Sequence, residues 1–170
     1  MFGLFKAKPA HAGMVSFTLA MDIACAADEL FGLVNPAAPT FWKRAAGRLE
    51  TIAPGRFRLH LHSEPECVRT LVVTEAEPGR VLALDTQATP RTGYVVSKNY
   101  RYCITPVDAR NCTVTLHMEA RFVPGLGKRD YDTGCRAVAE DLHTTLSMLK
   151  VHAEQGAGMV CRIDRLQSAA

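Results

Sequence analysis

The stretch RDYDTGCRAVAEDLHTTLSMLKVHAEQ, residues 129–155, decides the fold. Apolar side chains recur in it at steps of three and four residues, which is the spacing of one helix face. The members of this apolar stripe are Tyr131, Cys135, Val138, Leu142, Leu146, Leu149 and Ala153. The residues between them, Asp141 included, are mostly polar and are expected to face water, and Gly156 is expected to end the helix. At ~1.5 Å per residue the helix is roughly 40 Å long, enough to lie across a whole sheet.

The chain before this helix reads mainly as strands. Residues 15–23 alternate apolar and polar side chains, and the same period of two runs through residues 48–122, interrupted by turns such as Pro54-Gly55 and Pro78-Gly79. Two short helices are expected between the first and second strands, over residues 26–34 and near Trp42. Because the links between strands are short, consecutive strands must be antiparallel. The sequence therefore predicts an α+β fold with a seven-stranded antiparallel sheet and a long C-terminal helix.

Composition and charge exclude several classes of protein. The 170 residues favour one domain, and a net charge of +3 with no run of more than two basic residues argues against a nucleic-acid binder. No apolar run is long enough for an integral membrane segment. The six cysteines are scattered without a C-x-x-C pair, so reduced thiols and a cytoplasmic location are the simplest interpretation. We expect an N-terminal arm over residues 1–13, a ligand-binding domain over 14–156 and a loose tail over 157–170.

The order of elements resembles the START/SRPBCC superfamily, whose helix-grip fold is shared by birch-pollen-allergen-like proteins, polyketide cyclases and lipid-transfer domains. The local stretches that carry the resemblance are IACAADELF (residues 23–31), Asn35-Pro36 followed by Trp42, EAEPGRV (75–81), YRYCITPV (100–107) and TVTL (113–116). Many relatives have proline where this chain has Cys25. The resemblance covers the chain except its arm and tail, and it implies a curved sheet wrapped around the long helix.

The resemblance also implies an apolar cavity between sheet and helix, which the superfamily uses to hold a ligand. Binding or transport of a small hydrophobic molecule (a lipid, isoprenoid, aromatic or polyketide-like compound) is the leading hypothesis. A cyclase/dehydratase-type enzyme acting on a polyketide-like substrate is an alternative, and so is a non-catalytic adaptor whose cavity is filled. No cofactor is expected, and a weak homodimer is left open.

One strand face is the best candidate for a pocket wall. Tyr94, Tyr100 and Tyr102 share that face with Lys98, and their rings and polar tips suit the orientation of a ligand. The alternative is ordinary tyrosine core with Lys98 reaching out to water. The expected ligand-binding set is Trp42, Tyr94, Lys98, Tyr100, Tyr102, Met118, Leu142 and Leu146.

Catalytic and metal-binding candidates are weaker. Asp85 could pair with Lys98 as an acid–base couple if it points inward, but burial preferences favour an outward, solvated Asp85. His60 and His62 lie on one side of a strand, but a metal site needs a third ligand and none is indicated. Hydrolase, zinc-protease and phosphate-loop motifs are missing from the sequence. The connector VPGLGK, residues 123–128, is interpreted either as a flexible gate or as a plain turn.

Overall fold

The computed structural model describes residues 5–6 and 13–168. In chain order its elements are β1 (Phe5–Lys6), β2 (Met14–Ile23), α1 (Ala27–Val34), the 3₁₀ helix η1 (Trp42–Ala45), β3 (Gly47–Ala53), β4 (Arg56–Leu61), β5 (Val68–Glu77), β6 (Val81–Thr89), β7 (Val95–Pro106), β8 (Cys112–Phe122), α2 (Lys128–Gln155) and α3 (Ala157–Ser168). The predicted strands and helices of the central domain are all present, and α2 has 28 residues.

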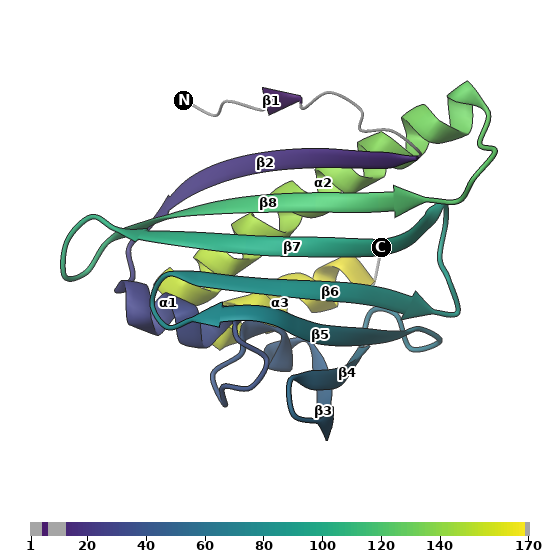
Figure 1. Ribbon diagram of the computed structural model, residues 1–170. Helices are drawn as coiled ribbons and strands as arrows, with labels where there is room; N and C mark the ends of the chain where they lie inside the picture. The colour runs from purple at the N-terminus through teal and green to yellow at the C-terminus, as the bar shows by residue number, and fades with distance from the viewer. Residues whose placement is uncertain (1–4, 7–12, 169–170) are drawn as a thin grey trace.

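The strands form one antiparallel sheet in the order β1-β2-β8-β7-β6-β5-β4-β3. The pairing of β2 with β8 joins the beginning of the domain to its end, and the remaining neighbours are consecutive hairpins. Helix α2 runs across one face of this sheet (Figure 1). The predicted α+β helix-grip architecture is therefore confirmed. The seven predicted strands are β2 to β8, and the two-residue β1 adds an edge strand.

The core lies where α2 meets β2 and β8. In β8 the inward residues Cys112, Val114, Leu116, Met118, Ala120 and Phe122 are buried, while their neighbours along the strand are more exposed. The α2 residues that oppose them include Leu142, Leu146 and Leu149, which are also fully buried. Strand alternation and helix periodicity thus supply matching apolar faces.

Helix α2 packs closely against β8 at Gly134. A Cβ atom at this position would lie 2.5 Å from the Cε1 atom of the Phe122 ring. Glycine is required here by close packing, although in sequence it is a poor helix residue.

The two ends of the chain differ from expectation. Most of the predicted N-terminal arm lies outside the described residues, but Phe5–Lys6 pairs with β2 as β1. The prediction of a loose tail is wrong for residues 157–168, which form α3 and pack against α2 and η1. Gly156 ends α2 as predicted and has a φ of 84°, a conformation that lets the chain reverse there. Val160 of α3 is fully buried, and the Cys161 thiol donates to the carbonyl oxygen of Ala45 at 3.0 Å.

Within the described ranges, no helix combines the length and the apolar character that a membrane crossing requires.

Candidate functional site

Helix α2 carries a second stripe beside its apolar one, here called the wall stripe. Its residues follow one another at steps of four, three, four and three: Gly134, Val138, Asp141, Thr145 and Met148. Gly134 and Val138 line a hollow between α2 and strands β5, β6 and β7, and the other three line a hollow between α2, η1 and the segment that joins β4 to β5. The helix therefore packs tightly on one half of the sheet and leaves space under the other half.

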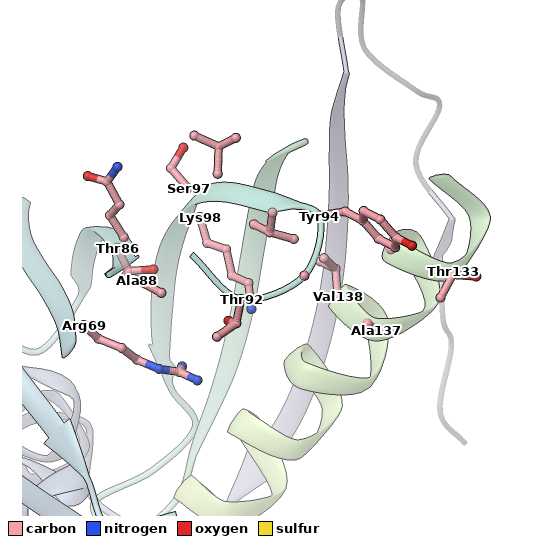
Figure 2. A pocket seen from close by; sticks show the side chains of 15 residues that line it. Arg69, Thr86, Ala88, Thr92, Tyr94, Ser97, Lys98, Thr133, Ala137 and Val138 are labelled. Carbon is pink, nitrogen blue, oxygen red and sulfur yellow. The ribbon is translucent and has the colours of Figure 1, made fainter. Parts of the chain in front are cut away.

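The larger of the hollows that α2 borders, here called the main hollow, has a volume of about 400 Å³. Its walls come from β5 through Arg69, from β6 through Thr86, from β7 and the residues before it through Tyr94 and Lys98, and from the N-terminal half of α2 (Figure 2). Thr92, Gly93 and other exposed residues form its rim, so it opens at the β6–β7 loop. The volume falls in the range of about 300–1,000 Å³ typical of small-molecule sites.

Two smaller hollows share wall residues with the main one. The second, of about 150 Å³, lies among η1, the β4–β5 turn, α2 and α3, and its walls include Trp42, Lys43 and Asp141. The third, of about 20 Å³, is lined by Lys43, Thr86, Tyr100 and Tyr102 among others. Thr86 borders the main and third hollows, Lys43 the third and second, and Arg69 the main and second. The three spaces therefore adjoin one another around charged side chains.

The first part of this charged cluster connects β7 to α2. Lys98 donates from Nζ to Asp141 Oδ2 at 2.6 Å, and the Tyr100 hydroxyl donates to the same oxygen at 2.8 Å. The side chains of Lys98 and Asp141 are 20% and 29% exposed. Burial alone would raise the pKa of Asp141, but the cations Lys98 and Lys43 and the two hydrogen bonds lower it overall. Burial, and then the charge of Asp141, raises the pKa of Tyr100 well above its ordinary value.

The second part joins β5 to the turn before it. Arg69 points inward from β5, on the same face as Leu71. Its Nη2 atom donates to both carboxylate oxygens of Glu64, at 2.6 and 2.8 Å, and its Nε atom donates to Oε2 at 3.2 Å. This multidentate geometry fixes the guanidinium on the wall between the main and second hollows.

The third part is Lys43, which η1 places beside the ring of Trp42. Its Nζ atom lies 5.2 Å from the ring centroid, within the range of a cation–π contact. In the part of the chain that the structure describes, no carboxylate forms an ion pair with Lys43. Burial, and then the neighbouring cation Arg69, lowers the pKa of Lys43 to about 8. The ammonium is therefore mostly protonated at neutral pH.

The structure distributes the eight expected ligand-binding residues over different surroundings. Tyr94 and Lys98 border the main hollow, Trp42 the second, and Tyr100 and Tyr102 the third. Met118, Leu142 and Leu146 are fully buried in the core and border none of these three hollows. The Tyr94 hydroxyl donates to Asp130 Oδ1 of α2 at 3.0 Å, which joins the residue before β7 to the helix beside the main hollow.

Asp85 does not form the suggested acid–base couple with Lys98. The register between β6 and β7 places Asp85 opposite Asn99 and Thr86 opposite Lys98. Because side chains alternate between the two faces of a sheet, Asp85 and Lys98 point to opposite faces. Asp85 is exposed and accepts a hydrogen bond from Asn99 Nδ2 at 2.8 Å.

The two strand histidines also lie apart from the cluster. His60 is 3.8 Å from a carboxylate oxygen of Glu50, and His62 is exposed. Among the described residues, no group of three or more histidine, cysteine or carboxylate side chains is arranged to hold a metal ion.

Sequence reasoning did not find Lys43, Glu64, Arg69 and Asp141. The expectation that Asp141 faces water is wrong, since its carboxylate turns toward Lys98 and Tyr100. A signal was present: Asp141 follows Val138 by three residues and precedes Thr145 by four, which places it on the wall stripe. Arg69 alternates with Leu71 and Val73, and this places it on the inward face of β5.

A long helix held across one face of an antiparallel sheet, with hollows between them, defines the helix-grip fold of the START/SRPBCC class. Solved structures of that class share the fold of this chain. A START superfamily protein from Mycobacterium smegmatis matches with a TM-score of 0.60 and 16% identity, over 84% of this chain and 97% of its own. Ara h 8.0201 matches with a TM-score of 0.65 and 9% identity, over 87% of this chain and 98% of its own.

The di-domain ARO/CYC BexL matches with a TM-score of 0.59 and 16% identity over 84% of this chain, which spans half of BexL. No family model matches the sequence, and neither does any curated protein. Because the identities are only 9–16%, these matches establish the fold and nothing finer. That fold is the START/SRPBCC fold that the resemblance in sequence predicted.

Proposed function

We propose that this protein binds a small or medium-sized hydrophobic molecule, of lipid, isoprenoid, aromatic or polyketide-like character, in the hollows between α2 and β5 to β7. The observation that carries the proposal is the main hollow of about 400 Å³, whose wall is largely apolar. Burial of apolar ligand surface contributes roughly 25 cal/mol per Å². The cost of immobilising the ligand offsets part of that gain. The fold of the START superfamily protein and of Ara h 8.0201 supports the same role by analogy.

The pair formed by Asp141 and Tyr100 supports a binding role better than an acid–base reaction, whereas Lys43, with a pKa of about 8, is the one group of the cluster that could exchange a proton near neutral pH. A general acid or base works best when its pKa lies near the operating pH. The pKa of Asp141 is lowered and that of Tyr100 is raised, so both are held away from neutrality. Together with the outward position of Asp85, this arrangement favours orientation of a ligand by Lys98 and Tyr100 over cyclase/dehydratase chemistry. The ARO/CYC name of BexL keeps that activity as the second candidate.

The surface gives less support to an adaptor. Among the described residues, the strongly exposed large hydrophobic side chains are Ile52 and Val107. They lie on β3 and in the β7–β8 turn, at separate places in the sheet order. Isolated exposed apolar residues are normal for a folded protein, whereas an interaction surface needs a continuous patch. The cytoplasmic location belongs to this proposal and stays a prediction.

The decisive experiment fills the main hollow. Ala137 lies on its wall and is otherwise exposed, so Ala137→Trp introduces a large ring without removing a core contact. We expect the affinity for the neutral dye Nile red, followed by its fluorescence, to fall at least tenfold, or by ~1.4 kcal/mol. The matched control is His143→Trp, an exposed position on the same helix that does not border the hollow.

The outcomes separate clearly. Loss of dye binding in Ala137→Trp alone, with both variants melting like the parent protein, supports the proposed site. Equal dye binding in both variants, or absence of dye binding in the parent, overturns it. Native mass spectrometry of freshly purified protein then looks for a retained small molecule that is lost from Ala137→Trp.

A further inference from the structure

We infer that the hydrophobic ligand carries one carboxylate-like negative charge, which is held by the ammonium group of Lys43 and the hydroxyl group of Tyr102. This inference rests on the proposed function and narrows its ligand class. The hydrophobic part then extends from the third hollow past Thr86 into the main hollow, since Thr86 borders both.

The charge balance of the cluster points to a single negative charge. Lys98 is paired with Asp141, and Arg69 is paired with Glu64. Lys43 interacts electrostatically with all four of these groups, so the five charges belong to one neighbourhood. Three cations face two carboxylates there, which leaves an excess of one positive charge. A partly buried charge without a counter-charge is costly, and one monoanionic group would balance it.

Unused hydrogen-bonding capacity lies at the same place. Tyr102 is only 3% exposed, and its side chain borders the third hollow together with Lys43. Its hydroxyl oxygen has no hydrogen-bond partner among the described residues and is not one of their fully enclosed unpartnered atoms, so it keeps open space beside it. A hydroxyl group beside a hollow can still donate to a ligand, and a carboxylate oxygen there would accept from both Tyr102 and Lys43. Such charge-assisted hydrogen bonds are about twice as strong as neutral ones.

The lowered pKa of Lys43 agrees with this geometry. Its causes are burial and the cations Arg69 and Lys98, which outweigh the attraction of Asp141 and Glu64. A bound carboxylate would raise the pKa of Lys43 again. The preference for an anionic ligand should therefore weaken as the pH rises above about 8, where the ligand-free ammonium loses its proton. The other groups that face Lys43 are Tyr100 and Tyr102, whose pKa values are raised and which stay neutral in this range.

Decanoate and decanol are the matched probes, because they share a chain and differ in charge. Each competes with Nile red in a low-salt buffer at neutral pH. We expect decanoate to bind the parent protein at least tenfold more tightly than decanol, a difference of ~1.4 kcal/mol. Lys43→Met should bind decanoate and decanol with about equal affinity, and its affinity for decanol should equal that of the parent protein. Methionine keeps the length of the side chain and removes the charge, so the variant should melt no lower than the parent.

Arg44→Met is the control. Arg44 is the next residue in η1, is exposed, and loses the same charge without bordering the hollows. The control should keep the preference for decanoate. Equal binding of decanoate and decanol to the parent overturns the inference and leaves the proposed function standing. An equal loss in Arg44→Met and Lys43→Met overturns it as well, because the effect would then be general electrostatics. Failure of the dye and of both probes to bind the parent contradicts the proposed function itself.

Discussion

The two halves of the sheet beneath α2 differ in what the helix presents to them. Toward β2 and β8 the helix presents its apolar stripe, and Leu142, Leu146 and Leu149 are fully buried there. Away from β2 and β8 it presents the wall stripe, where Asp141 and Thr145 are polar and Gly134, which borders the main hollow, also contacts β8. Apolar side chains fill the first interface, whereas hollows and a charged cluster occupy the second.

This difference separates stability from binding within a single helix. Core packing depends on large side chains that interdigitate at high density. A ligand site depends on space and on a few polar groups that fix orientation. The two stripes lie side by side on α2, and Val138 is the one residue that belongs to both. Substitutions on the apolar stripe should therefore cause the largest losses in the free energy of unfolding. Substitutions on the wall stripe should cause smaller losses, limited to the contacts of Gly134 with Phe122 and of Asp141 with Lys98.

The largest effect is expected for Leu142→Arg, at the centre of the apolar stripe. Leu142 is fully buried, so arginine would place an unpaired charge in the core and exceed the available volume. We expect a loss of roughly 4 kcal/mol or more in the free energy of unfolding, measured by urea denaturation. His143→Arg, at the exposed neighbouring position, should change it by less than about 0.5 kcal/mol. A folded Leu142→Arg protein with parent-like stability would show that the tight half of the interface is assigned to the wrong face.

Gly134→Val tests the point where the wall stripe touches β8. Helix propensity alone would make valine equal to or slightly better than glycine. The Cβ position lies 2.5 Å from the Phe122 ring, however, and overpacking of this kind typically costs about 1–3 kcal/mol. We expect a loss of that size in urea denaturation, with recovery of part of it in the double variant Gly134→Val/Phe122→Leu. A stability equal to or above that of the parent would mean that α2 is free to move away from β8.

Much of the fold follows from local periodicity in the sequence. The apolar stripe of α2 and the alternation in β2 and β8 each repeat over several turns or residue pairs, so their burial can be predicted without knowledge of partners. Local periodicity did not predict α3 over residues 157–168. The segment was expected to be a loose tail because it is a chain terminus, whereas burial of Val160 in a helix that packs on α2 and η1 is a tertiary effect.

The site could be predicted only in part. Tyr94, Lys98 and Trp42 border hollows because strand alternation and aromatic character place them inward. Hydropathy predicted that Asp141 faces water. The partner that holds it inward, Lys98, is 43 residues away in sequence, so local patterns could not reveal it. Lys43 was missed for a related reason. A short 3₁₀ helix has no periodicity that indicates which side faces the interior.

Asp141→Asn on the wall stripe should have the smallest effect on stability. The substitution removes the counter-charge of Lys98 but keeps a side chain of the same size. Because Asp141 is 29% exposed, water screens part of the loss, and we expect a decrease of about 1 kcal/mol in the free energy of unfolding at neutral pH. Glu140→Gln, at the exposed preceding position, is the matched control and should change it by less than about 0.5 kcal/mol.

The pH dependence of Asp141→Asn identifies the cause of that loss. The pKa of Asp141 is lower in the folded protein than in the unfolded chain, so between the two values the unfolded chain binds more protons and stability rises with pH. The contribution of Asp141 is therefore complete above its ordinary pKa of about 3.9 and disappears as the pH falls through the folded value. Urea denaturation at a series of pH values should show the parent and Asp141→Asn curves converging in acid. A difference between the two curves that stays constant over the whole pH range would contradict this explanation. The loss of stability would then come from altered packing or hydrogen bonds and not from the negative charge that faces Lys98.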